Sequence, residues 1–106
     1  DQQIRVADFA PSGAALEPAN GEELGRAVVA AGQHVAVTLD LARVRVVSSS
    51  FANALFLTLA EAGDLEAWRE LVSFANVTAL VAESLRRSLD AARTSRVREP
   101  APASRG

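Results

Sequence analysis

The stretch VAVTLDLARVRVVSSSFANALF, residues 35–56, decides the fold, because a strand pattern changes to a helix pattern within it. In VAVTLDL the larger apolar residues alternate with small or polar ones, which predicts a strand over 34–40. Both faces of this strand carry small or apolar side chains, so we expect both to be covered. After the serines, apolar residues recur at helical spacing and predict a helix over 50–62.

The segments on either side also alternate between strand and helix patterns. Residues 3–8 and 69–74 have the composition of strands, and 21–31 and 77–92 carry apolar residues on one helical face. Residues 44–47 form either a short further strand or a loop that returns to the sheet. This order predicts an α/β fold, in which about three helices pack on a small, mainly parallel sheet.

Two asparagines are placed to begin helices. Asn20 is an N-cap candidate with Glu23 at the reciprocal capping-box position, and Asn76 is the N-cap candidate of the last helix. The last helix carries an apolar stripe that we expect to be buried. It consists of Leu80, Val81, Leu85 and Leu89.

The chain is long enough for one domain. It has 106 residues, of which 49% are hydrophobic, so it can bury a core without disulfides or metals. We predict one domain over 1–93. Residues 94–106 lack periodicity and end in PAPASRG, which predicts a disordered tail or linker.

Composition excludes several classes of site. The chain has no cysteine and one histidine, which excludes thiolate chemistry and a multi-histidine metal site, so we predict no metal and no cofactor. No apolar run approaches the roughly 20 residues that span a bilayer, so we predict no membrane contact. No basic-then-apolar leader is visible, and we therefore expect a cytoplasmic location.

Charge is unevenly distributed along the chain. The net charge is −2, but residues 71–106 hold six arginines and three acids. A basic end can contact nucleic acid or an acidic partner, and it is equally typical of a solvated helix terminus. We favour the solvated terminus and predict no nucleic-acid partner.

The three serines at 48–50 precede the most apolar helix of the chain. A serine oxygen can accept a hydrogen bond from an unpaired N–H of the first turn, which stabilises a helix by about 1 kcal/mol. A helix N-terminus also tolerates a phosphate, and the added charge can eject a partner. The sequence does not decide whether these serines form a helix cap or carry a phosphorylation switch.

Few residues of the helix after the serines are polar. Such a helix is either deeply buried or lends one side to a partner. The sequence leaves both interpretations open. In the second one, the partner can be another copy of the chain, which gives a homodimer. The predicted interaction surface consists of Ser48, Phe51, Asn53, Ala54, Leu55 and Phe56.

The segment LDLARVRVVSSSF, residues 39–51, resembles the signature of STAS domains, the fold of anti-sigma-factor antagonists. In that pattern a strand ends in Leu-Asp-Leu, a loop contains an apolar residue, and a helix begins with Asp-Ser-Ser-Gly. Without gaps, the loop residue is Val44, and SSSF at 48–51 takes the place of Asp-Ser-Ser-Gly. The SSSFA run is similar to a divergent branch, the STAS-like domains of unknown function. The resemblance is strong over 34–62 and holds through element order over 20–93.

The resemblance implies roles for individual residues. The serine phosphorylated in STAS domains matches Ser50, with Ser49 as the second candidate acceptor. Ser48 replaces the aspartate and Phe51 replaces the glycine, and a phenyl ring there either blocks a kinase or turns inward. The acidic pair usual in the divergent branch is replaced by Asn53 and Ala54. The implied partner is a serine kinase of the histidine-kinase-like ATPase type, or another regulator.

Asp40 ends the strand that precedes the serines. Functional groups of α/β folds lie at such positions, but a lone carboxylate there more often holds the following loop. No second titrating group is visible nearby, so we predict that the domain is not an enzyme. We expect a regulatory protein-interaction module with a serine switch; the alternatives are an assembly domain without phosphorylation and, less favoured, a nucleotide-binding protein or enzyme that uses Asp40.

Overall fold

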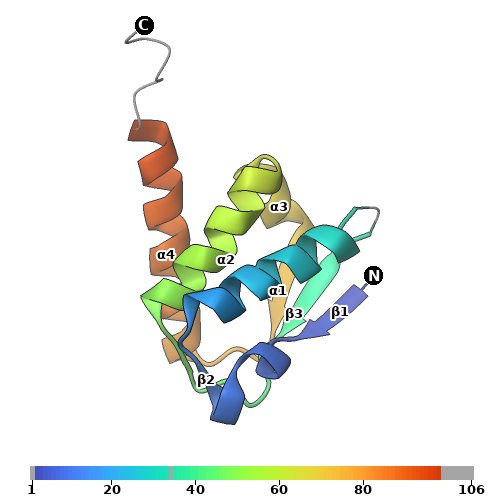
Figure 1. Cartoon of the computed structure of the whole chain (residues 1–106), viewed down its shortest axis with the longest axis vertical. Coiled ribbons are helices and arrows are strands. Elements are labelled where there is room, and N and C mark those ends of the chain that lie inside the picture. Colours follow the sequence, from blue (N-terminus) through green and yellow to red (C-terminus); the bar gives the residue numbers. More distant parts are fainter. Residues whose placement is uncertain (1, 34, 99–106) are drawn as a thin grey trace, which may run out of the picture.

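The computed structural model describes residues 2–33 and 35–98 and confirms the predicted α/β class (Figure 1). The described part of the chain forms four α-helices, two 3-10 turns and two small parallel sheets. The helices are α1 (Pro18–Ala31), α2 (Ser49–Ala62), α3 (Leu65–Leu71) and α4 (Ala79–Arg98), and the turns are η1 (Val6–Phe9) and η2 (Pro11–Gly13).

The main sheet has three parallel strands, β1 (Gln2–Arg5), β3 (Val37–Asp40) and β5 (Val72–Ala75), with β3 in the centre. Each is shorter than predicted. A second sheet pairs β2 (Ala14–Ala15) with β4 (Val46–Val47), also in parallel. Since β4 ends one residue before the cap of α2, its pairing with β2 helps to fix where α2 begins.

Helices cover one face of the main sheet. Val37 and Leu39 are buried, and α1 crosses in front of the strands in Figure 1. On the opposite face Thr38 and Asp40 are only partly buried, and Ser73 is exposed. The expectation that both faces of β3 are covered is therefore wrong for the described residues. Its outer face carries small or polar side chains that water can solvate.

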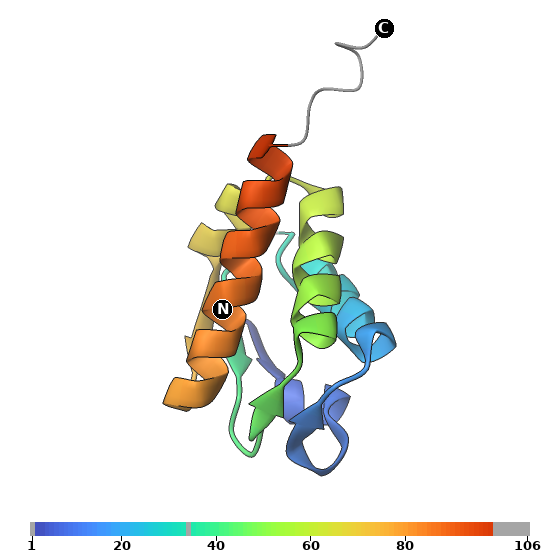
Figure 2. The ribbon, with the colours of Figure 1, turned by 90° about the vertical axis from the view of Figure 1, so that its left-hand side faces the viewer.

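The core lies between the sheet and the helices. α2 runs between α1 and α4, and Figure 2 shows α4 alongside it. The largest fully buried side chains come from η1, α1, β3, α2 and α4. They are Val6, Leu24, Val28, Val37, Leu39, Phe51, Leu55 and Val81.

Two glycines let α1 approach α2 closely. A Cβ on Gly21 would overlap the carbonyl oxygen of Phe51, and a Cβ on Gly25 would lie 2.7 Å from Cβ of Thr58. Any larger residue at these positions would push the two helices apart. The glycines are thus required by packing.

α3 was not predicted. The strand predicted over 69–74 begins only at Val72, because LEAWREL, residues 65–71, forms a seven-residue helix. Asp64 caps α3 by accepting a hydrogen bond from the Glu66 N–H at 3.2 Å. Only two positions of this two-turn helix are buried, Leu65 and Trp68. Two positions are too few to show the helical period in the sequence.

Both predicted asparagine caps are wrong. α1 begins at Pro18, where the fixed φ of proline suits a first helical position, so Asn20 lies inside the helix. Thr78, not Asn76, accepts the hydrogen bond from the Val81 N–H, at 3.1 Å. Asn76 adopts a left-handed backbone conformation with φ 57°.

The stripe of α4 is shifted from the predicted one. Val81 and Leu85 are buried and Leu89 packs against the core, but Leu80 is 65% exposed. The buried face continues through Ser88, because positions 81, 85 and 88 share one side of a helix. α4 extends to Arg98, past residue 94, where the predicted tail begins. The remainder of the predicted tail, 99–106, lies outside the described residues.

We predict that Gly21→Ala destabilises the fold by about 1–3 kcal/mol through overpacking against α2. The direction is informative, because glycine to alanine inside a helix otherwise stabilises by about 1 kcal/mol. Urea denaturation measures the change. The control is Glu23→Ala on the exposed side of α1, which should stay within about 0.5 kcal/mol of the parent chain. A more stable Gly21→Ala variant would contradict the close helix contact.

Candidate functional site

The N-cap of α2 is Ser48. Its Oγ accepts a hydrogen bond from the Phe51 N–H at 3.0 Å and donates one to the carbonyl oxygen of Leu16 at 2.8 Å. The hydroxyl therefore caps α2 and ties it to the chain segment before α1. Ser49, another of the three serines considered for the cap, is instead the first helical residue.

The backbone around Ser48 is also held in place. Its N–H donates to the carbonyl oxygen of Ala15 at 2.8 Å, and its own carbonyl oxygen accepts from the Ala52 N–H at 3.0 Å. The first bond extends the β2–β4 pairing and the second is the first turn of the helix. The start of α2 is thus fixed from both sides.

Ser49 and Ser50 lie in the first turn of α2 and are both exposed. The predicted helix over 50–62 likewise places Ser50 in its first turn. The turn carries the positive end of the helix dipole, so an anion attached here is favoured electrostatically. Two hydroxyls at this point are available to an approaching molecule.

Phe51 turns into the core. Its side chain is 1% exposed, and its carbonyl group lies against Gly21 of α1. Of the two orientations considered for this ring, the inward one is found. The ring therefore does not cover the neighbouring Ser50 hydroxyl.

The predicted interaction surface needs correction. Phe51, Leu55 and Phe56 are buried in the core of this domain, at 1%, 1% and 4% exposure, because α1, the sheet and α4 together enclose most of α2. Ser48 and Ala54 are partly buried and Asn53 is exposed. The side of α2 that remains open is a polar stripe with a single large apolar member. It consists of Ser49, Ser50, Asn53, Leu57 and Glu61.

Asp40 holds two loops together at the end of the sheet. Its Oδ1 accepts hydrogen bonds from Nδ2 of Asn76 at 2.8 Å and from the Ala42 N–H at 3.0 Å. The bond from Asn76, followed by that from Ala42, holds the pKa of the Asp40 carboxyl below its usual value. Asp40 is the last residue of β3, and Asn76 directly follows β5. Because these two strands pair in parallel, their ends meet at the same edge of the sheet, and this pairing predicts the contact between Asp40 and Asn76.

The described residues contain no cluster of three or more histidine, cysteine or acidic side chains able to hold a metal ion. Across the same part of the chain, no helix is both long and apolar enough to cross a membrane.

Sequence comparison assigns the chain to a family. The family model described as STAS-like domain of unknown function (DUF4325) matches residues 23–82, which include β3, the serines and α2. The chain therefore belongs to this family, and its parallel sheet with packed helices is consistent with a STAS-like fold. No curated protein and no solved structure matched the chain.

We predict that Ser48→Ala destabilises the domain by about 0.5–2 kcal/mol, because it removes the cap of α2 and the bond to Leu16. Ser50→Ala is the matched control. It should change the free energy of unfolding by less than about 0.5 kcal/mol, since Ser50 is exposed. Thermal and urea denaturation measure both. Equal losses in the two variants would contradict the assignment of the cap to Ser48.

We predict that Asp40 contributes to the acid sensitivity of the fold. Its pKa is lowered in the folded state, so its contribution is present above the unfolded value of about 3.9 and is lost as pH falls through the folded value. Asp40→Asn should therefore show a shallower loss of stability as pH falls from about 5 to about 2. Asn76→Ala, which removes the first donor, should flatten the same profile. Profiles parallel to that of the parent chain would argue against this role.

Proposed function

We propose that this domain is a non-catalytic regulatory module that binds a protein partner, and that phosphorylation of Ser50 switches the binding. The observation that carries the proposal is the exposed position of Ser50 in the first turn of α2, next to a cap that another serine already forms.

The division of roles among the serines supports Ser50 as the acceptor. The Ser48 hydroxyl both donates and accepts a hydrogen bond in the fold, so its modification would remove the bond that it donates to Leu16. Ser49 is also exposed, and the resemblance to STAS domains favours Ser50 over it. Because Phe51 is buried, its ring does not stand between Ser50 and a kinase.

A phosphate on Ser50 would act on the surface rather than on the fold. It adds about −1.5 to −2 charges at pH 7, and the positive end of the helix dipole stabilises them. The charge would lie beside the open stripe of α2, which includes Asn53 and Leu57. A partner that covers Leu57 would have to desolvate the phosphate, which weakens the complex.

The proposed kinase is of the histidine-kinase-like ATPase type, by resemblance to STAS domains. We also propose that the domain has no catalytic activity. In support, the Asp40 carboxylate is engaged in two hydrogen bonds that hold loops together. The burial of Phe51 and Phe56 removes the main reason to expect a homodimer through α2. The serine switch is therefore favoured over an assembly domain without phosphorylation.

We predict that incubation with ATP and such a kinase from the same genome places one phosphate on Ser50, mapped by tandem mass spectrometry. Ser50→Ala should abolish this phosphate, and Ser49→Ala should retain it. Ser50→Asp should weaken binding of the kinase roughly tenfold, which corresponds to one unfavourable charge contact. Phosphate found on neither serine, or lost in Ser49→Ala alone, would refute the proposal.

A further inference from the structure

A groove lies between α4 and the part of the fold formed by α2, α3 and β5. It consists of two pockets, of about 260 and 230 Å³. Both are lined by Phe56, Phe74 and Leu89, so they adjoin each other. We call the larger one the Trp68 pocket and the smaller one the Leu85 pocket, after a residue that lines only that one.

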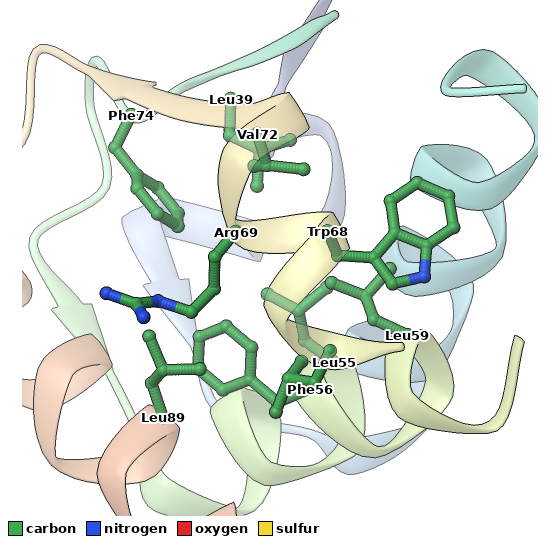
Figure 3. Close-up of a pocket in the computed structure, with 10 residues that line it drawn as sticks. Leu39, Leu55, Phe56, Leu59, Trp68, Arg69, Val72, Phe74 and Leu89 are labelled. Atoms are coloured by element: carbon green, nitrogen blue, oxygen red, sulfur yellow. The ribbon is translucent and has the colours of Figure 1, made fainter. Parts of the chain in front are cut away.

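The Trp68 pocket is shown in Figure 3. Trp68 lies at one side of it, and the guanidinium group of Arg69 lies between Phe74 and Leu89 at the other. Aromatic and aliphatic side chains make up the rest of the wall. Such a pocket accepts a bulky apolar group.

The groove runs beside an open edge of the main sheet. β5 is the last strand of the sheet, and within the described residues it pairs only with β3. The carbonyl oxygen of Ala75 accepts from the Leu41 N–H, so Ala75 directs its backbone toward β3. Successive residues of a strand direct their backbone groups to opposite sides, and those of Phe74 therefore point to the open edge.

Phe74 thus connects the edge with both pockets. Its N–H and C=O point toward the outside of the sheet, while its side chain lines both pockets and is 40% exposed. An open strand edge is a template for another extended segment. Side chains two residues apart on such a segment point to the same face and lie about 6.6–6.8 Å from each other.

We propose that this groove binds an extended peptide of a partner protein, which pairs with β5 and places two apolar side chains, two residues apart, in the Trp68 and Leu85 pockets. Backbone pairing supplies affinity in this mode of recognition, and the pockets supply specificity. Arg69 and Arg86 also line the pockets, but Arg69 pairs with Glu66, and Arg86 pairs with Glu83 and Asp90. Their charges are therefore balanced within the chain, and the groove selects a peptide by its extended shape and its apolar side chains. The proposal does not depend on a switch at Ser50.

Trp68 provides a direct readout, because it is the only tryptophan of the chain and lines one pocket. The probes are capped nine-residue peptides with Leu, Ile, Val or Phe at two positions two residues apart, flanked by Glu or by Lys. The full chain is titrated while Trp68 emission is recorded. We expect saturable binding below about 1 mM by both sets, because the arginines of the groove are already paired with acids of the chain.

Backbone pairing is tested without altering the protein. A methyl group is placed on one peptide nitrogen at a time. Methylation should weaken binding roughly fivefold at alternate positions, where the N–H faces β5, and should have little effect at the positions between. Uniform loss at all central positions would indicate a bound helix and would overturn the proposal.

The groove itself is tested with a matched pair of variants. Leu89→Gln adds a polar group to a residue that both pockets share, and should weaken binding at least fivefold. Leu57→Gln changes an exposed leucine of α2 outside both pockets, and should leave binding unchanged. Ser50→Asp should also leave it unchanged. No response of Trp68 to any peptide, or equal binding by Leu89→Gln and the parent chain, would overturn the proposal.

Discussion

The close contact of α1 with α2 at Gly21 and Gly25 is the constraint on which the candidate site depends. Without side chains at these two positions, the α1 backbone lies directly on α2, against Phe51 and Thr58. That spacing encloses the ring of Phe51, which leaves the preceding serine on the outside. A cap-forming serine then completes the arrangement by tying the start of α2 to the chain that enters α1. The exposed serines are therefore a consequence of helix packing.

The serine run has two physical roles, divided by position. Ser48 occupies the place where STAS domains carry an aspartate, and aspartate and serine are both good N-cap residues. The substitution therefore preserves the cap and removes a charge. The loss of that negative charge leaves the helix N-terminus more favourable to an added anion. The departure from the STAS pattern at this position is thus compatible with a phosphate at Ser50.

Local patterns predicted part of this structure, and contacts between distant residues determined the rest. The strand before the serines and the helix after them have clear periods, and both were found. α3 was missed because a seven-residue helix presents too few buried positions, Leu65 and Trp68, to show a period. The burial of Phe56 depends on neighbours from other elements, which no pattern within α2 contains. Asp40 and Asn76 are 36 residues apart, and only strand pairing brings them together.

The serine site and the groove share α2, which raises the question of whether they influence each other. Coupling between two sites requires an element with two arrangements that both ligands bias. α2 is packed on several sides, and its Phe56 fills space between the sheet and α4. A phosphate at the exposed first turn interacts with the dipole of α2 and with solvent. Neither interaction becomes stronger if Phe56 moves. We therefore expect the proposed phosphate on Ser50 and the proposed peptide in the groove not to influence each other.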